Sequence, residues 1–187
     1  MQGIIVSEFI SLDGVIEAPG GEAGYRHTGW TIDIDQDPTM YDFKLTEAQA
    51  AEALLLGRRT YEGFAAVWPE REGEFADTFN AMPKYVVSST LTDPTWNNTH
   101  VVSGVDDVAK LVDGVGGPLL VAGSGTLVHG LYDAGLVDEW RLMVFPVILG
   151  SGRRLFPSDA LDKTKLRLAD ATTYANGVQL QIFRPEP

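Results

Sequence analysis

The sequence predicts an α/β fold: one domain spanning residues 1–187, with helices packed on a mixed, mostly parallel sheet in a three-layer sandwich. Short apolar runs, typical of strands buried on both faces, alternate with segments whose apolar residues recur at helical spacing. This alternation favours parallel strands joined by helices. The chain closes with two strand-like segments, 166–173 and 178–184, around Asn176-Gly177, a dipeptide typical of hairpin turns. We therefore expect an antiparallel C-terminal hairpin at one edge of the sheet.

The individual elements follow in order along the chain. The expected strands before the hairpin are 3–10, 53–56, 84–89, 99–103, 118–122 and 137–149, and the expected helices are 46–52, 58–68, 74–82, 105–112 and 126–134. Thr46 is the expected N-cap of the first helix. Pro146 indicates that the strand containing it lies at an edge or breaks there. The glycine-rich stretch 20–37 is typical of a binding loop or lid.

Composition excludes several classes of protein. The chain has 187 residues, 44% of them hydrophobic and 21% charged, which is ordinary for one globular domain. It has no cysteine, which excludes disulfides, thiolate nucleophiles and zinc–sulfur sites. The formal net charge of −12 disfavours nucleic acids and anionic membrane surfaces as partners. No segment resembles a membrane span or a signal peptide, so we expect a cytoplasmic protein.

The turn after the second expected strand is the first candidate ligand site. Gly57 ends the apolar run, and Arg58, Arg59 and Thr60 begin the next helix. A helix N-terminus carries free N–H groups and a partial positive charge, so two arginines have the wrong sign there unless an anion lies nearby. A bound phosphate would explain them. The alternative is a solvated pair of arginines.

Two further strands are followed by hydrogen-bond donors. These donors are Ser88, Ser89 and Thr90 after one strand, and Gly123, Ser124, Gly125 and Thr126 after the other. Ligands of open α/β sheets bind outside the carboxyl ends of the strands, so three such turns could hold one extended polyphosphate. The alternatives are a hydroxyl cap cluster and a tight turn. The standard dinucleotide fingerprint is absent, because Val128 occupies its third glycine position.

Other chemistry finds less support in the sequence. The three histidines, His27, His100 and His129, lack the spacing of metal ligands, and we expect no metal site. Ser124 lacks the surroundings of a nucleophilic serine, because Val121 replaces the first glycine of that motif. The acids Asp33, Asp35, Asp37 and Asp42 are typical of a solvated loop. Arg153 and Arg154 are expected to form a surface or oligomer contact.

Taken together, these motifs resemble a known family. They are Ser-Leu-Asp-Gly at 11–14, Leu-Leu-Leu-Gly-Arg-Arg-Thr-Tyr-Glu at 54–62, Val-Val-Ser-Ser-Thr at 86–90, Leu-Leu-Val-Ala-Gly-Ser-Gly-Thr-Leu at 119–127 and Pro-Val-Ile-Leu-Gly-Ser-Gly at 146–152. Their order resembles the dihydrofolate reductase fold, and within it the branch of the C-terminal reductase domain of riboflavin biosynthesis enzymes and its stand-alone relatives. The resemblance covers nearly the whole chain.

The resemblance implies a set of NADPH contacts. It assigns Arg58 to the 2′-phosphate, and Arg59 and Thr60 to the pyrophosphate. Ser88 and Ser89, with Thr90 beside them, would approach the phosphate of the adenosine ribose. Gly123, Ser124 and Gly125 would back the pyrophosphate and the nicotinamide. Thr126 stands where dihydrofolate reductases often carry a further arginine.

The resemblance also implies a reaction. It indicates an NADPH-dependent reductase of a small pterin-, pyrimidine- or flavin-related heterocycle, similar to 5-amino-6-(5-phosphoribosylamino)uracil reductase or dihydrofolate reductase. Asp42 would be its proton donor or substrate anchor, and burial against Trp30 or Phe43 would raise the pKa of Asp42. The alternative is a non-catalytic module that binds a dinucleotide or an antifolate. The apolar segment 137–149 is expected to form the edge of a homodimer.

Overall fold

The computed structural model describes residues 3–156 and 163–186. The strands are β1 (Gly3–Ser11), β2 (Ala53–Gly57), β3 (Lys84–Val87), β4 (Thr99–Val102), β5 (Pro118–Ala122), β6 (Val137–Phe145), β7 (Leu166–Thr173) and β8 (Gln179–Pro185). The helices are α1 (Pro38–Ala50), α2 (Arg58–Val67), α3 (Glu74–Ala81), α4 (Val105–Gly114) and α5 (Gly125–Asp133), with a 3₁₀ turn η1 (Trp68–Glu70) after α2.

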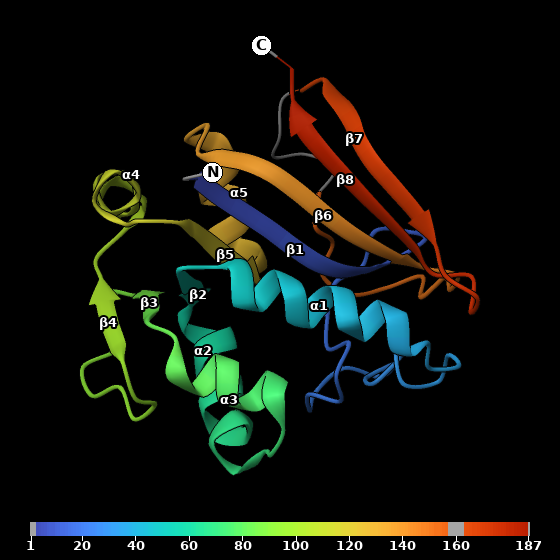
Figure 1. Ribbon diagram of the computed structural model, residues 1–187, viewed down its shortest axis with the longest axis horizontal. Coiled ribbons are helices and arrows are strands. Elements are labelled where there is room, and N and C mark those ends of the chain that lie inside the picture. Colours follow the sequence, from blue (N-terminus) through green and yellow to red (C-terminus); the bar gives the residue numbers. More distant parts are fainter. Residues whose placement is uncertain (1–2, 157–162, 187) are drawn as a thin grey trace.

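The strands form one eight-stranded sheet in the order β4-β3-β2-β5-β1-β6-β8-β7. The pairings from β4 to β6 are parallel, and β8 pairs antiparallel with both β6 and β7. Figure 1 shows β7 and β8 as a ribbon that extends the sheet on one side. The prediction of a mostly parallel sheet with an antiparallel C-terminal hairpin is therefore confirmed.

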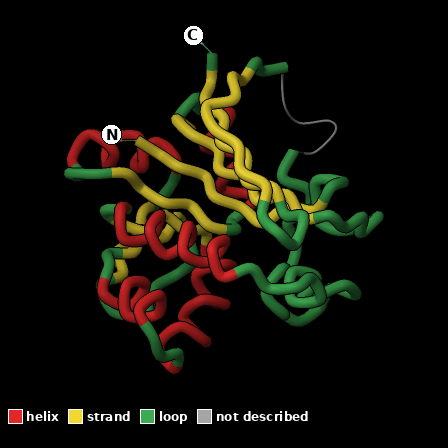
Figure 2. Tube along the Cα trace, turned by 45° about the vertical axis from the view of Figure 1, so that its right-hand side comes forward, coloured by secondary structure: helices red, strands yellow, loops and turns green. Residues whose placement is uncertain are grey.

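Helices cover both faces of the parallel part of the sheet (Figures 1 and 2). Ile4 and Val6 of β1 belong to a buried cluster that includes Leu131 of α5 and Val108 of α4. Ile5, between them in sequence, belongs to a second cluster that includes residues of α1, α2 and α3. Because neighbouring side chains of a strand point to opposite faces, this alternation divides the core into two layers. The three-layer arrangement is confirmed.

The first helix begins earlier than the sequence predicted. The expected start at Thr46 is wrong, because α1 begins at Pro38, with Asp37 as its N-cap. The Asp37 carboxylate accepts a hydrogen bond from the amide of Thr39 at 2.9 Å. The inner face of α1 carries the charged side chains Lys44 and Glu47, which hide the apolar spacing that normally predicts a helix. Asp42 therefore lies on a helix and not in a loop before it.

The strand β6 lies inside the sheet. It ends at Phe145, directly before Pro146, so the predicted break is correct. The predicted edge position is wrong, since β6 pairs with β1 on one side and with β8 on the other. The outer strands are β4 and β7, so β6 offers no free edge for a homodimer.

The glycine-rich loop between β1 and α1 folds back onto the sheet. Its Trp30 is buried, donates its indole N–H to the carbonyl of Glu17 at 2.8 Å and meets Phe145 edge to face.

Asp13, just after β1, accepts hydrogen bonds from the amides of Leu149 and Gly150. Burial opposes the charge on Asp13, but these bonds and one from Ser11 outweigh it and lower the pKa to about 2. No helix among residues 3–156 and 163–186 is long and apolar enough to span a membrane.

Candidate functional site

Four turns line the same edge of the sheet, because β4, β3, β2 and β5 are parallel and each turn follows a carboxyl end. In the order of the strands, these turns begin at Ser103, Ser88, Gly57 and Gly123. The turns after β2 and β5 lead directly into α2 and α5. The sequence prediction that the three donor clusters share one edge is therefore correct in its topology.

The turns after β2 and β5 are hydrogen-bonded to each other. The amide of Gly57 donates to the Ser124 hydroxyl at 2.9 Å, and the amide of Ser124 donates to the Thr60 hydroxyl at 2.9 Å. We call these two bonds the turn clip. Gly123 has φ +61°, and a Cβ there would lie 3.2 Å from Thr60, so both the backbone angle and the close approach require glycine. The clip fixes the N-termini of α2 and α5 beside each other.

Arginines surround the turn clip. Arg58 is paired with Glu62 one helical turn away, at 2.8 Å, and both side chains are about half exposed. Arg59 is exposed. Arg153 reaches the N-terminus of α5 from a distant loop, since a Cβ on Gly125 would lie 3.3 Å from its Cδ. The arginines and the free first-turn amides of the helices can together attract an anion.

Arg153 and Arg154, which are neighbours in sequence, have different surroundings. Arg154 forms an ion pair with Asp13 at 3.6 Å. Arg153 instead has its backbone fixed, by a bond from its amide to Glu17 and one from the Ile16 amide to its carbonyl. Its side chain extends over the N-terminus of α5, and these two hydrogen bonds hold its backbone in place.

The turn after β3 is organised locally. The Ser88 hydroxyl accepts hydrogen bonds from the amides of Thr90 and Leu91, which is the arrangement of a serine turn. Ser89 and Thr90 are exposed. Ser88 thus has a structural use, and its hydroxyl also lies 3.5 Å from that of Thr90.

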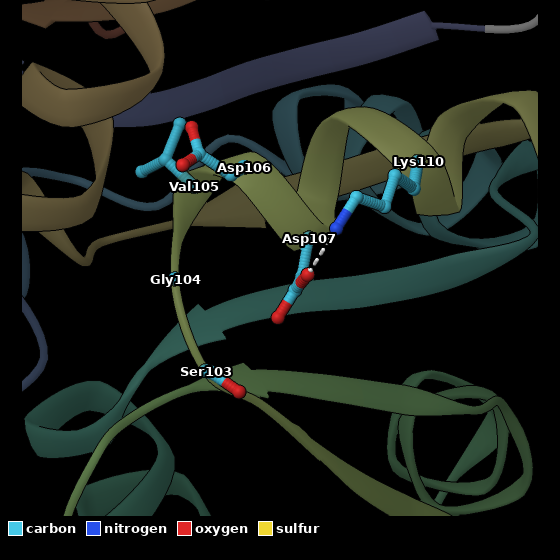
Figure 3. Close-up of a pocket in the computed structure, with 6 residues that line it drawn as sticks. All are labelled: Ser103, Gly104, Val105, Asp106, Asp107 and Lys110. Carbon is cyan, nitrogen blue, oxygen red and sulfur yellow. Dashed lines mark hydrogen bonds and ion pairs between the residues drawn. The ribbon is translucent and has the colours of Figure 1, made fainter.

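A hollow lies at the carboxyl end of β4, where α4 begins (Figure 3). It is lined by Ser103, Gly104, Val105, Asp106, Asp107 and Lys110. Asp107 and Lys110 are ion-paired at 2.8 Å, as the dashed line in Figure 3 marks. With two acids and one paired cation, this hollow suits an uncharged or cationic group better than a phosphate.

Glu8 lies beneath the turn after β5. It is buried, and its Oε2 accepts a hydrogen bond from the amide of Gly123 at 3.1 Å. Burial raises the pKa of Glu8 well above its usual value; the nearby charge of Glu47 adds to this, and Lys44 and the Gly123 amide oppose it. A buried acid therefore touches the turn that the family resemblance assigned to the cofactor.

A second polar cluster lies on the opposite face of β1, beneath α1. The Lys44 ammonium donates to the Ser7 hydroxyl and to the Glu47 carboxylate, both at 2.6 Å. Arg141 of β6 pairs with the other oxygen of Glu47 at 3.3 Å and with Glu139 at 2.7 Å. Burial raises the pKa of Glu139, but hydrogen bonds from Arg141 and Arg184 outweigh it and lower the pKa. These charges compensate one another, as buried charges must.

Asp42 lies apart from both polar clusters. Its side chain is exposed on α1, so the expected burial against Trp30 or Phe43 is wrong. The buried residues of α1 are Met40, Glu47 and Ala48. Of the other predicted acids, Asp37 caps α1 and also accepts a bond from the Ala175 amide, while Asp33 and Asp35 are exposed.

Sequence reasoning missed Glu8, Lys44 and Glu47 as site residues, and it assigned Arg153 to a surface or oligomer contact. Glu8 interrupts the apolar face that Ile4, Val6 and Ile10 form on β1, which is the one signal the sequence offered. Within the described ranges, no three histidine, aspartate or glutamate side chains are placed to hold a metal ion.

The comparisons with known proteins agree with this architecture. Residues 2–180 match the family model of the RibD C-terminal domain. The uncharacterized protein YyaP of Bacillus subtilis (strain 168) is 28% identical over 186 residues, covering 96% of this chain and 93% of that protein. A putative riboflavin biosynthesis protein from Shewanella sp. PV-4 superimposes with a TM-score of 0.75 at 20% identity, covering 99% of each chain.

The dihydrofolate reductase from Enterococcus faecalis, solved in complex with NADP(H) and RAB-propyl, superimposes with a TM-score of 0.67 at 16% identity. The match covers 100% of this chain and 98% of that one. The fold is therefore dihydrofolate reductase-like. By the extent of the family-model match, the chain belongs to the family of the RibD C-terminal domain.

Proposed function

We propose that this protein is an NADPH-dependent reductase of a small heterocyclic substrate related to pterins, pyrimidines or flavins. The observation that carries the proposal is the turn clip, which holds two helix N-termini side by side at the carboxyl edge of the sheet. Family membership supports a reductase, and a similar fold has been solved with NADP(H).

The donors at this edge fit an anionic dinucleotide. The residues that would hold it are Gly57, Arg58, Arg59 and Thr60 in one turn, Ser88, Ser89 and Thr90 in the next, and Gly123, Ser124, Gly125 and Thr126 in the third. Arg153 adds a cation at the N-terminus of α5, where Thr126 offers none. The nicotinamide would supply the hydride, while these residues bind and orient it.

The substrate would lie toward α1. We propose Asp42 as the carboxylate that anchors the substrate or donates a proton, with the bound substrate covering it. If Asp42→Asn leaves the reduction rate of an identified substrate unchanged, this role is wrong. Lys44 and Ser7 lie deeper on the same side and would limit how far a substrate could extend beneath α1.

A binding module without turnover is the second candidate. The exposure of Asp42 and the pairing of Glu47 with Lys44 and Arg141 favour it, because neither acid of α1 is then a free buried proton donor. Steady-state oxidation of NADPH in the presence of pterin, pyrimidine and flavin substrates separates the two candidates. Turnover with any of them excludes the binding module.

The proposal is tested by titrating the purified protein with NADPH and NADH, following nicotinamide fluorescence. Arg58→Ala should weaken NADPH binding by about 10- to 100-fold, the loss of one charge-assisted contact of about 1.5–3 kcal/mol. NADH, which lacks the 2′-phosphate, should lose much less. Glu62→Gln should strengthen NADPH binding severalfold, because it releases Arg58 from its ion pair.

Arg167→Ala is the matched control, since Arg167 is exposed on β7 at the far edge of the sheet. Equal losses for NADPH and NADH in Arg58→Ala would contradict the 2′-phosphate assignment. No binding of either cofactor would overturn the proposed function.

We also propose a homodimer, through a surface other than β6, and a monomer in light scattering at micromolar concentration would exclude it.

A further inference from the structure

Glu8 lies where the pairing between β1 and β5 ends. The last parallel pair in the register is Ser7 with Ala122. One residue further on, the amide of Gly123 donates to the Glu8 carboxyl at 3.1 Å. A side chain therefore replaces the next backbone bond of the ladder, directly beneath the turn that opens α5.

The second oxygen of this carboxyl has no partner. Glu8 is 4% exposed, and its Oε1 is buried without a hydrogen bond to any of the described residues. An ionised carboxylate with one unpaired buried oxygen is costly, whereas a neutral carboxyl loses much less on burial. The burial that raises the pKa of Glu8 acts in the same direction.

The charges around Glu8 are few. Lys44 and Glu47 of α1 act on it with opposite signs, and Lys44 is itself engaged by Glu47 and Ser7. From the β5 side it meets the backbone amide of Gly123, and Arg153 lies further along, over Gly125. Among the residues that the structure describes, Glu8 thus has no cation of its own that would keep it ionised.

We propose that Glu8 is a positioning residue that holds the Gly123–Gly125 turn as a neutral acid, so that the turn can receive the phosphates of a dinucleotide. This inference rests on the proposed function and adds a residue to its site. A neutral carboxyl accepts the Gly123 amide without placing a negative charge beside the phosphates. When Glu8 ionises, its charge repels the phosphates and its unpaired oxygen favours entry of water beneath the turn. NADPH affinity therefore falls as the pH rises through the pKa of Glu8.

The test is NADPH binding as a function of pH in the wild type and in Glu8→Gln. Glutamine keeps the shape and a carbonyl acceptor for Gly123 but cannot ionise. Between about pH 5 and about pH 9, wild-type affinity should fall roughly tenfold more than that of Glu8→Gln, which corresponds to a coupling of about one pKa unit. The matched control is Glu52→Gln, since Glu52 is exposed and lies before β2, at the other end of that strand. The pH dependence of NADPH affinity in Glu52→Gln should match that of the wild type.

Parallel pH profiles for the wild type and Glu8→Gln would overturn the inference. So would a Glu8→Gln variant that keeps its NADPH affinity and pH profile but loses turnover, because Glu8 would then act on the substrate.

A readout without cofactor separates this inference from the proposed function. In NMR spectra of the free protein, the Gly123 amide resonance should titrate with pH in the wild type and stay constant in Glu8→Gln. If the wild type binds no NADPH but this amide titrates, the proposed function fails and Glu8 still positions the turn. If the wild-type amide does not titrate, the inference fails, even where Glu8→Gln does not fold.

Discussion

Ser124→Ala tests whether the turn clip supports the site. The Ser124 hydroxyl accepts the Gly57 amide at 2.9 Å and donates to the Ala122 carbonyl at 3.3 Å. Its removal leaves a half-buried amide of Gly57 without a partner, which costs about 1–2 kcal/mol. In a domain of this length, each kcal/mol lowers Tm by about 2–4 °C, so we expect a loss of about 2–8 °C.

A second substitution at the same position separates the hydrogen bond from backbone strain. Ser124 has φ +61° and ψ +35°, in the left-handed region, where a residue other than glycine costs about 1 kcal/mol. Ser124→Gly also loses the hydrogen bond but relieves this strain. We therefore expect Ser124→Gly to be more stable than Ser124→Ala by about 1 kcal/mol.

Thermal unfolding by differential scanning calorimetry measures both variants, and amide hydrogen exchange at Gly57 reports the bond directly. Faster exchange at Gly57 in both variants, together with the expected order of Tm, would support the clip. Wild-type Tm and unchanged exchange at Gly57 in Ser124→Ala would refute the reasoning. Variants in which the Gly57 amide exchanges faster should also bind NADPH more weakly, because the clip aligns the two helix N-termini.

Two further predictions concern other parts of the fold. Asn80 accepts the indole N–H of buried Trp96 at 2.7 Å and donates to the Trp68 carbonyl at 3.0 Å. Asn80→Ala should therefore lower the free energy of unfolding, measured in urea, by about 2–3 kcal/mol. Asn80→Asp should lose less, because it keeps the acceptor for Trp96. Equal losses in the two variants would contradict this account. Asp13 has a pKa lowered to about 2 in the folded protein, so its stabilising contribution is complete above the unfolded pKa of about 4 and is lost as pH falls through about 2. The difference in Tm between the wild type and Asp13→Asn should shrink across that window, and a constant difference would show that the carboxylate charge is not responsible.

Much of the fold could be predicted from the sequence, because strands such as β5 are short apolar runs and the hairpin of β7 and β8 surrounds the turn dipeptide Asn176-Gly177. The range of β5 was predicted correctly as 118–122 and that of β7 as 166–173. Both are bounded by residues that favour turns or solvent, and local composition decides such boundaries. The first helix was predicted less well. Its inner face carries Lys44 and Glu47, whose burial depends on partners in β1 and β6 that are distant in sequence.

The same division applies to the candidate site. By itself, the sequence determined the order of the strands along the chain, the glycine turns and the arginines after β2, because each depends on residues adjacent in the chain. Only the tertiary structure decided that Ser124 joins Gly57 and Thr60, that Arg153 reaches α5, and that Glu8 lies buried beneath Gly123. These contacts join residues from 28 to 115 positions apart. Their geometry is set by the packing of the sheet, and no local pattern in the sequence encodes it.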